Sequence, residues 1–368
     1  MALWLGWLGC VTPPPPDPGL SVEQITALVR PDVKDRAGWA YDVRAALIAA
    51  GRTPSEEDVC AVLAIVEQES GYAADPSVPG LSGIAKAEIE EQLAVLGPVS
   101  DLGKDWLLSP VPEGQTLSFE QRLGRVKTER DLDVLFREIV SYHTGDVPGL
   151  QKAGALLMPA RIDGLNPIRT AGSMQVSVSW AQELGGGEGL SRDAVREALY
   201  TRAGGLRYGT ARLFAHEATY DDPSYRFADY NAGLYASRNA AFQEALAKVT
   251  GMKVAPDGDL LIWNDAGRLE SKQSGQTMTA ALVWRATLAP DLEESRVRAD
   301  LRAEKTAHFE ETETWRRVRE TYRGKFDADP PYARLPDVAL ESPKIKKKWT
   351  TAWFAQSVDK RYEACRAR

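Results

Sequence analysis

Hydrophobic residues recur every three or four positions along most of this chain, the spacing that predicts amphipathic helices. The pattern predicts helices over 20–50, through 132–140, and over 191–218, 237–249, 276–288, 292–324 and 349–365. A short apolar run at 260–263, followed by a turn signal, predicts a strand. Because no pattern of alternating strands and helices is present, we expect a mainly α protein with a small β element.

The clearest single helix is expected between residues 53 and 71. Thr53 is the expected N-cap, with Pro54 at the first helical position and Glu56 three residues after the cap. Gly71 is expected to end this helix. Later in the chain, Ser237 is the expected N-cap of the helix over 237–249.

Two carboxylates near the end of that helix are expected to face different surroundings. At about 100° per residue, Glu69 lies roughly 20° around the axis from the apolar Val62, and Glu67 lies roughly 140° away, toward water. A carboxyl group against apolar walls has a raised pKa and can hold a proton near neutral pH. Glu69 is therefore a candidate general acid, and the alternative is a structural hydrogen bond at a helix end.

Composition excludes several classes of protein. The chain of 368 residues is 43% hydrophobic, which suits a globular protein, and its net charge of -7 argues against non-specific nucleic-acid binding. Three cysteines and three histidines are scattered, and Tyr220 stands where a second zinc-binding histidine would follow His216. A zinc site is therefore not expected, and no phosphate-binding loop motif is present.

Two later segments have side chains suited to sugars. Residues 170–176 place a Gly-Ser corner before Met174 and Gln175, and residues 229–233 place Tyr230 and Asn231 before a glycine. Amide and phenol groups supply hydrogen bonds to sugar hydroxyls and acetamido groups, and an aromatic ring supplies a stacking surface. Gly204, Gly205 and Gly209, between these segments, allow either close helix packing or a helix break.

Taken in order, the segments resemble the motifs of the soluble lytic transglycosylase family, whose α-rich fold is lysozyme-like, of the goose-type and transglycosylase kind. The matches are Glu69-Ser70-Gly71-Tyr72, Gly172-Ser173-Met174-Gln175-Val176 and Tyr230-Asn231-Ala232-Gly233. Ser173 replaces the family's usual Leu, and Asp229 replaces an Ala.

The spacing of these motifs indicates how the chain is organised. Glu69 and Gly172 are 103 positions apart, more than the family requires. The resemblance therefore implies a catalytic domain over 20–250 with a large insertion at about 73–168, as in an uncharacterised family of bacterial lipoproteins with such a core. Residues 251–368 are expected to form an α-rich region.

The resemblance also implies a reaction. In the family, one glutamate protonates the glycosidic oxygen between N-acetylmuramic acid and N-acetylglucosamine in peptidoglycan, and then acts as base while a 1,6-anhydro ring closes. Glu69 takes this role by resemblance, without metal or cofactor. The matching substrate-binding positions are Ser70, Met174, Gln175, Tyr230 and Asn231.

Two other functions stay open. A muramidase on the same scaffold would need water and usually a second carboxylate, for which Asp221, Asp222 and Asp229 are candidates. A catalytically inactive lipoprotein that binds the cell wall is favoured by the insertion and by the lysine-rich run 344–348. That run is either a solvated face or a contact for anionic lipid.

The N-terminus resembles a bacterial lipoprotein signal. An apolar run ends at Leu8-Gly9-Cys10, and Pro13 to Pro16 follow as an extended spacer, so residues 1–19 are expected to be signal and linker. We expect lipidation of Cys10, a periplasm-facing outer-membrane location and a true start upstream of Met1. The alternative is the apolar N-terminus of a cytosolic protein. Cys60 and Cys365 either pair in an oxidising compartment or remain separate thiols.

Overall fold

The computed structural model describes residues 19–94, 97, 100–145, 166–263, 269, 275–340 and 349–368. These residues form sixteen α-helices and two small antiparallel sheets of two strands each, so the expected mainly α class with a small β element is confirmed. None of the described helices is both long enough and apolar enough to cross a bilayer. Cys10, the proline spacer and the run 344–348 lie outside the described residues.

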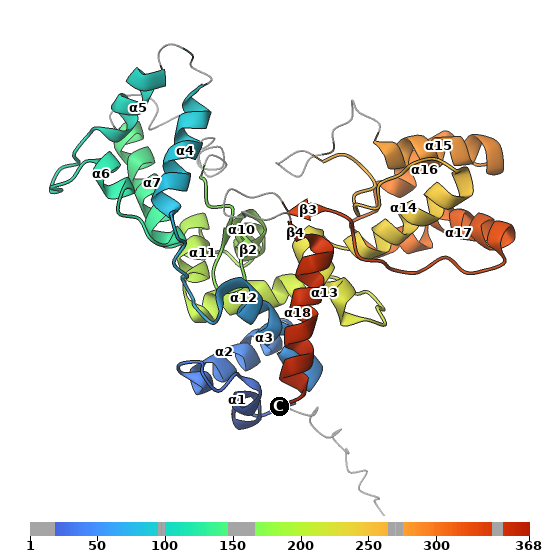
Figure 1. Ribbon diagram of the computed structural model, residues 1–368, viewed down its shortest axis with the longest axis horizontal. Helices are drawn as coiled ribbons and strands as arrows, with labels where there is room; N and C mark the ends of the chain where they lie inside the picture. The colour runs from blue at the N-terminus through green and yellow to red at the C-terminus, as the bar shows by residue number, and fades with distance from the viewer. Residues whose placement is uncertain are drawn as a thin grey trace, which may run out of the picture.

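The helices pack around three hydrophobic cores (Figure 1). The first core is formed by α1 (Val22–Leu28), α2 (Arg36–Ala49), α3 (Glu56–Ser70), α12 (Arg202–Leu213), α13 (Pro223–Ala232) and α18 (Thr351–Arg366).

The insertion core joins the expected insertion to the segments that follow it. Its elements are α4 (Leu81–Ala94), α5 (Ser100–Leu108), α6 (Phe119–Leu123), α7 (Glu129–Gly145), β1 (Thr170–Ala171), β2 (Val176–Ser177), α10 (Val178–Gly187) and α11 (Arg192–Leu199). The C-terminal core contains α14 (Ala236–Thr250), α15 (Gln276–Leu288), α16 (Glu294–Leu301), the 3-10 helix η2 (Ala307–Glu311) and α17 (Glu313–Phe326). The second sheet pairs β3 (Ala339–Leu340) with β4 (Trp349–Thr350).

Helix α3 passes through the middle of the first core, and eight consecutive residues, 59–66, are buried. Its N-cap is Ser55, whose hydroxyl accepts from the Asp58 backbone at 3.1 Å, so the expectation of Thr53 was wrong. Three acidic residues fill the first turn after Ser55, where they interact favourably with the helix dipole. The helix ends at Gly71 in the left-handed conformation, as expected.

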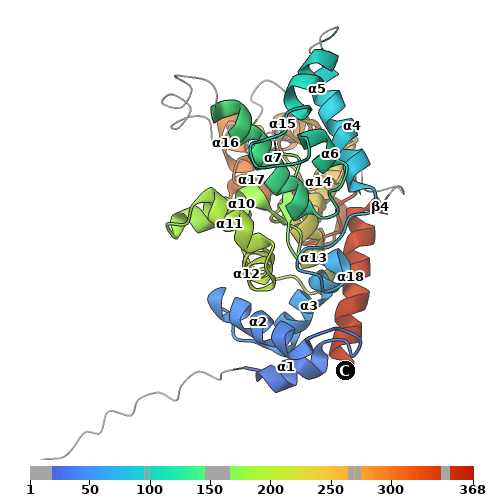
Figure 2. The ribbon, with the colours of Figure 1, turned by 90° about the vertical axis from the view of Figure 1, so that its left-hand side faces the viewer.

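The last helix returns to the first core. Helix α18 lies beside α3 in both views (Figures 1 and 2), and a disulfide joins Cys60 to Cys365 with the Cα atoms 5.6 Å apart. Residues 251–368 are therefore divided, because α15, α16 and α17 belong to the C-terminal core whereas α18 packs with the N-terminal helices.

Several local expectations differ from the structure. The stretch 20–50 is divided into α1 and α2, 191–218 into α11 and α12, and 292–324 into α16, η2 and α17. Helix α14 begins after Tyr235, so the expectation of Ser237 as its N-cap was wrong. Ser237 lies inside the helix, and its backbone N–H donates to Asp229 on α13. The run 260–263 is not a strand, and only Trp263 forms an isolated bridge, with Leu269.

Candidate active site

The three sequence motifs meet where the first core adjoins the insertion core. Glu69 is in the last turn of α3, and Tyr230 is on α13. The Tyr230 hydroxyl donates to the Met174 backbone carbonyl at 2.7 Å, which joins the third motif to the second. Tyr230 and Glu69 are close enough that the Glu69 charge, after burial, contributes to a raised pKa of Tyr230. The structure therefore brings the motifs together.

The second motif is a tight turn, 172–175, between β1 and β2. The strands pair Ala171 with Val176, and the Gln175 backbone N–H donates to the Gly172 carbonyl at 3.0 Å. Gly172 has φ +82, and a Cβ there would lie 2.4 Å from the Leu199 carbonyl oxygen. Only glycine fits this position, because both the backbone conformation and the neighbouring chain exclude a side chain.

The glycine-rich face of α12 supports this turn. A Cβ at Gly205 would lie 2.9 Å from Ser173 Oγ, and a Cβ at Gly209 would lie 2.4 Å from Met174 Sδ. The expected use of these glycines for close packing is confirmed, and the helix break falls instead at Tyr200, between α11 and α12. Met174 has no exposed surface, so it supports the turn from the first core.

The Gln175 side chain has both amide hydrogens bound inside the protein. Its Nε2 donates to Glu129 Oε2 at 2.9 Å and to the Gly172 carbonyl at 3.3 Å. Its Oε1 accepts from the Thr170 hydroxyl at 2.9 Å. Gln175 also has φ +50, a conformation uncommon for residues other than glycine. These contacts leave the amide oxygen as the atom with spare hydrogen-bonding capacity.

Glu129 is the site residue that sequence reasoning missed. The chain leaves α3, and Val78 N donates to the Lys127 carbonyl at 2.9 Å beside a bridge between Ser77 and Thr128. The insertion thus returns next to its own start. Glu129 is the first residue of α7 and is 2% exposed.

A local signal for the start of α7 was available in the sequence. Thr128 Oγ1 accepts from Asp131 N, and Asp131 Oδ2 accepts from Thr128 N, which is the reciprocal arrangement of a capping box. This pattern predicts where the helix begins. It does not predict that the beginning lies beside Glu69.

The Glu69 carboxyl group has unusual electrostatics. Its side chain is only partly exposed, and no hydrogen bond or ion pair to it is present among the described residues. Desolvation by the surrounding protein, followed by the negative charge of Glu129, raises the pKa of Glu69 to about 8. Glu69 is therefore largely protonated at neutral pH.

Glu67 differs from expectation. Its side chain is 16% exposed and pairs with Arg30 Nη1 at 3.1 Å, and Arg361 Nε lies 3.6 Å away. The expectation that Glu67 faces water was wrong, because the chain after α1 and helix α18 cover that side of α3. The charge of Glu67 is balanced by Arg30 and Arg361, whereas Glu69 has no ion-pair partner among the described residues.

Two other predicted residues make contacts within the protein. The Ser70 hydroxyl donates to the Val66 carbonyl of its own helix at 3.0 Å. Asn231 is exposed, and its Oδ1 accepts from the Thr351 hydroxyl at 3.1 Å, at the start of α18. Asn231 thus ties α13 to the C-terminal helix.

Two of the three candidate aspartates have structural partners, and Asp221 is exposed. Asp229 has no exposed surface and binds His216 Nε2 at 2.9 Å, the Tyr220 hydroxyl at 2.6 Å and the Ser237 backbone at 2.6 Å. Asp222 accepts from Ser224 N at the start of α13.

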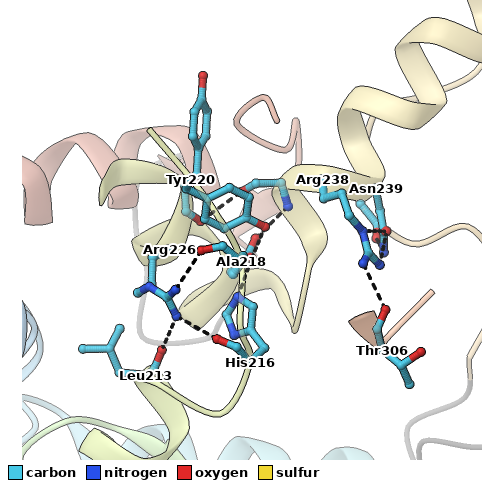
Figure 3. A network of polar contacts seen from close by, with 12 residues as sticks. Leu213, His216, Ala218, Tyr220, Arg226, Arg238, Asn239 and Thr306 are labelled. Carbon is cyan, nitrogen blue, oxygen red and sulfur yellow. Dashed lines mark hydrogen bonds and ion pairs between the residues drawn. The ribbon is translucent and has the colours of Figure 1, made fainter. Parts of the chain in front are cut away.

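Two arginines, Arg238, which is buried, and Arg226, which is partly buried, complete this polar network (Figure 3). Arg226 donates to the backbone carbonyls of Leu213, His216 and Ala218, and Arg238 reaches the Thr306 carbonyl. Nowhere in the described ranges do three or more His, Cys, Asp or Glu side chains gather as they would around a metal ion.

The fold and the site define a helical protein with a partly buried, unpaired glutamate where two hydrophobic cores meet. Comparison with family models shows that the chain belongs to the family described as "Protein of unknown function (DUF1615)", which matches residues 32–368. The chain is also 39% identical over 364 residues to the "Uncharacterized protein YaiW" of Escherichia coli (strain K12), covering 97% of this chain and 94% of that one. No solved structure matched.

Proposed function

We propose that this protein is a lytic transglycosylase of peptidoglycan, with a lysozyme-like catalytic core and Glu69 as its acid and base. The observation that carries the proposal is the placement of Glu69 beside Glu129 and Tyr230, with a pKa of about 8. A general acid needs a proton at the working pH, and this carboxyl group holds one.

The proposed reaction has two proton transfers. Glu69 first donates its proton to the glycosidic oxygen that joins N-acetylmuramic acid to N-acetylglucosamine, and the C1–O bond breaks. The Glu69 carboxylate then takes the proton of the muramoyl C6 hydroxyl while that oxygen bonds to C1. The product carries a 1,6-anhydro ring, water is not consumed, and Glu69 ends protonated as it began.

Surface charge beside the insertion suits a substrate that carries carboxylates. A pocket of about 480 Å³ on α6 and α7 is lined by Arg122, Arg125 and Arg130 together with Asp131. Arg122 pairs with Glu138, and Arg130 pairs with Glu197 at 3.1 Å. Arg130 directly follows Glu129 in α7. Arginine binds carboxylates well, and the peptide stems of peptidoglycan carry them, so Arg125 is the lining residue that supports a cell-wall substrate.

The proposed location is the periplasmic face of the outer membrane, with a lipid on Cys10. The disulfide between Cys60 and Cys365 supports an oxidising compartment, because such bonds are rare in a reducing cytosol. Binding of glycan strands would then occur next to the anchoring membrane.

Hydrolysis is the second candidate function. Glu129 supplies a second carboxylate near Glu69, which a muramidase would use to activate water. Its amide contact with Gln175 and its low exposure favour a supporting role, so transglycosylation is preferred.

Digestion of purified sacculi by the purified protein tests the proposal. We expect wild type to release muropeptides with anhydro ends by mass analysis, and Glu69→Gln to be at least about 100-fold slower. Glu57→Gln is the matched control, because Glu57 is exposed in the first turn of the same helix. The control should digest sacculi at the wild-type rate.

Other products would point elsewhere. Reducing ends that incorporate labelled oxygen from water would establish the hydrolase. Equal rates for Glu69→Gln and wild type, or sacculi that bind the protein without release of fragments, would contradict the enzyme and favour a cell-wall-binding lipoprotein.

A further inference from the structure

We infer that Glu129, supplied by the insertion, is a positioning residue that acts on Glu69 and fixes Gln175. The inference rests on the proposed function and extends it, because it makes the insertion an integral part of the active site. The insertion would then be required for catalysis and would not be a separate binding module.

The position of Glu129 is set by the backbone. The bridge between Ser77 and Thr128 ties the start of α7 to the segment that leaves α3. The capping contacts between Thr128 and Asp131 then fix the first turn of α7, which carries Glu129. Glu129 is thereby held by the chain that directly follows Glu69, despite a separation of 60 positions.

The hydrogen bond from Gln175 determines which way Glu129 faces. Gln175 Nε2 donates to Glu129 Oε2 at 2.9 Å, and the Thr170 hydroxyl holds the opposite end of the amide. The start of a helix also favours a negative charge. The second motif and the insertion thus form one hydrogen-bonded unit beside Glu69.

The charged and titratable groups around the pair come from several elements. Glu129 on α7 and Tyr230 on α13 lie near enough to Glu69 for electrostatic interaction with its charge. Asp75, after α3, and Tyr200, at the end of α11, are near enough to Glu129 for their charges to interact. Among these neighbours, Glu129 is the one whose charge acts on the proton of Glu69.

Arg212, on α12, is a cation near Tyr230. It lies over the Trp180 ring at 5.7 Å and acts on Tyr230 and Asp229. Its charge is not among the causes that set the pKa of Glu69, which are burial and the charge of Glu129.

A fixed negative charge beside Glu69 serves both proton transfers. Two close carboxylates resist sharing two negative charges, so Glu69 keeps its proton until the glycosidic oxygen takes it. Once charged, Glu69 is a stronger base because the same repulsion favours recovery of a proton, here from the C6 hydroxyl. Glu129 thus helps to balance the acid and base roles near neutral pH.

The test is the titration of Glu69 in wild type and in Glu129→Gln. Carbon-13 NMR of the Glu69 carboxyl group reports its midpoint without any need for activity. We expect the midpoint to move to lower pH by roughly half a unit or more when the neighbouring charge is removed. The high-pH limb of muropeptide release should move in the same direction.

Glu138→Gln is the matched control. Glu138 lies on the same helix, is half exposed and pairs with Arg122. This variant removes one negative charge from α7. It should change neither the titration midpoint of Glu69 nor the high-pH limb of muropeptide release. If Glu129→Gln does not fold, Glu129→Asp can be used, because its side chain is one methylene shorter and its charge lies farther from Glu69. A smaller decrease in the titration midpoint of Glu69 is then expected.

The outcomes separate this inference from the proposed function. An unchanged Glu69 midpoint in a folded Glu129 variant would overturn the inference, whatever the activity. A midpoint that moves as expected while wild type releases no anhydro product would support the electrostatic role of Glu129 and reject the transglycosylase.

Discussion

Met174 packs directly on Gly209: a Cβ at Gly209 would lie 2.4 Å from Met174 Sδ and 2.5 Å from Met174 Cβ. The backbone carbonyl of the same methionine accepts the Tyr230 hydroxyl. The spacing between α12 and the 172–175 turn therefore sets the distance between the second and third motifs.

Gly209→Ala should disturb this contact. We expect a loss of about 1–3 kcal/mol in the free energy of unfolding, because the added methyl group must displace Met174, and helix propensity returns up to about 1 kcal/mol of that loss. Urea unfolding measures the change, and sacculus digestion should slow.

Gly186→Ala is the control for this prediction, because a Cβ at that helical glycine meets nothing within 4 Å. It should be neutral or stabilising. A Gly209→Ala protein as stable and active as wild type would show that the turn adapts freely.

Glu69→Gln should alter stability in a pH-dependent way. The native pKa of Glu69 is about 8 and its ordinary value is 4.5, so the native state binds more protons than the unfolded state between these pH values. Wild-type stability from this group therefore falls as pH rises from about 4.5 to about 8. The variant lacks this loss. Its free energy of unfolding relative to that of wild type should therefore rise by up to about 3 kcal/mol between pH 4 and pH 7.

Thermal unfolding at both pH values measures that gain. Glu57→Gln serves as control, because its exposed side chain should give the same difference from wild type at each pH. A Glu69→Gln difference that does not change with pH would mean that Glu69 titrates normally.

Asp229→Asn should destabilise the fold without changing the chemistry. Asp229 accepts from His216, Tyr220 and Ser237, and an amide nitrogen would face some of these donors. We expect a loss of about 2–4 kcal/mol by thermal unfolding. The pH profile of digestion per folded molecule should stay as in wild type. Full loss of activity at wild-type stability would instead assign Asp229 a chemical role.

The disulfide should contribute to stability by joining distant parts of the chain. Cys60 and Cys365 are separated by 305 positions, and we expect replacement of both by serine to cost about 2–4 kcal/mol. Reductant should lower the melting temperature of wild type and leave the double variant unchanged. Free thiols at both positions in the purified, non-reduced protein would contradict the pairing.

The limits of sequence reasoning are clear at α3. The periodicity of its apolar residues and the left-handed preference of Gly71 located the end of the helix and the turn that carries Glu69. The same periodicity gave the wrong surroundings for Glu67, because rotation around an axis does not say which element covers each face.

The sequence by itself determined the helical class, the end of α3, the glycine-rich face of α12 and the residues of the three motifs, because these depend on contacts between residues a few positions apart. Only the tertiary structure decided that Glu129 lies near Glu69, that Cys60 pairs with Cys365 and that Asp229 is a structural acceptor. Those relationships join residues that local patterns cannot connect. In each case the residues are separated in sequence, and the packing of whole helices brings them together.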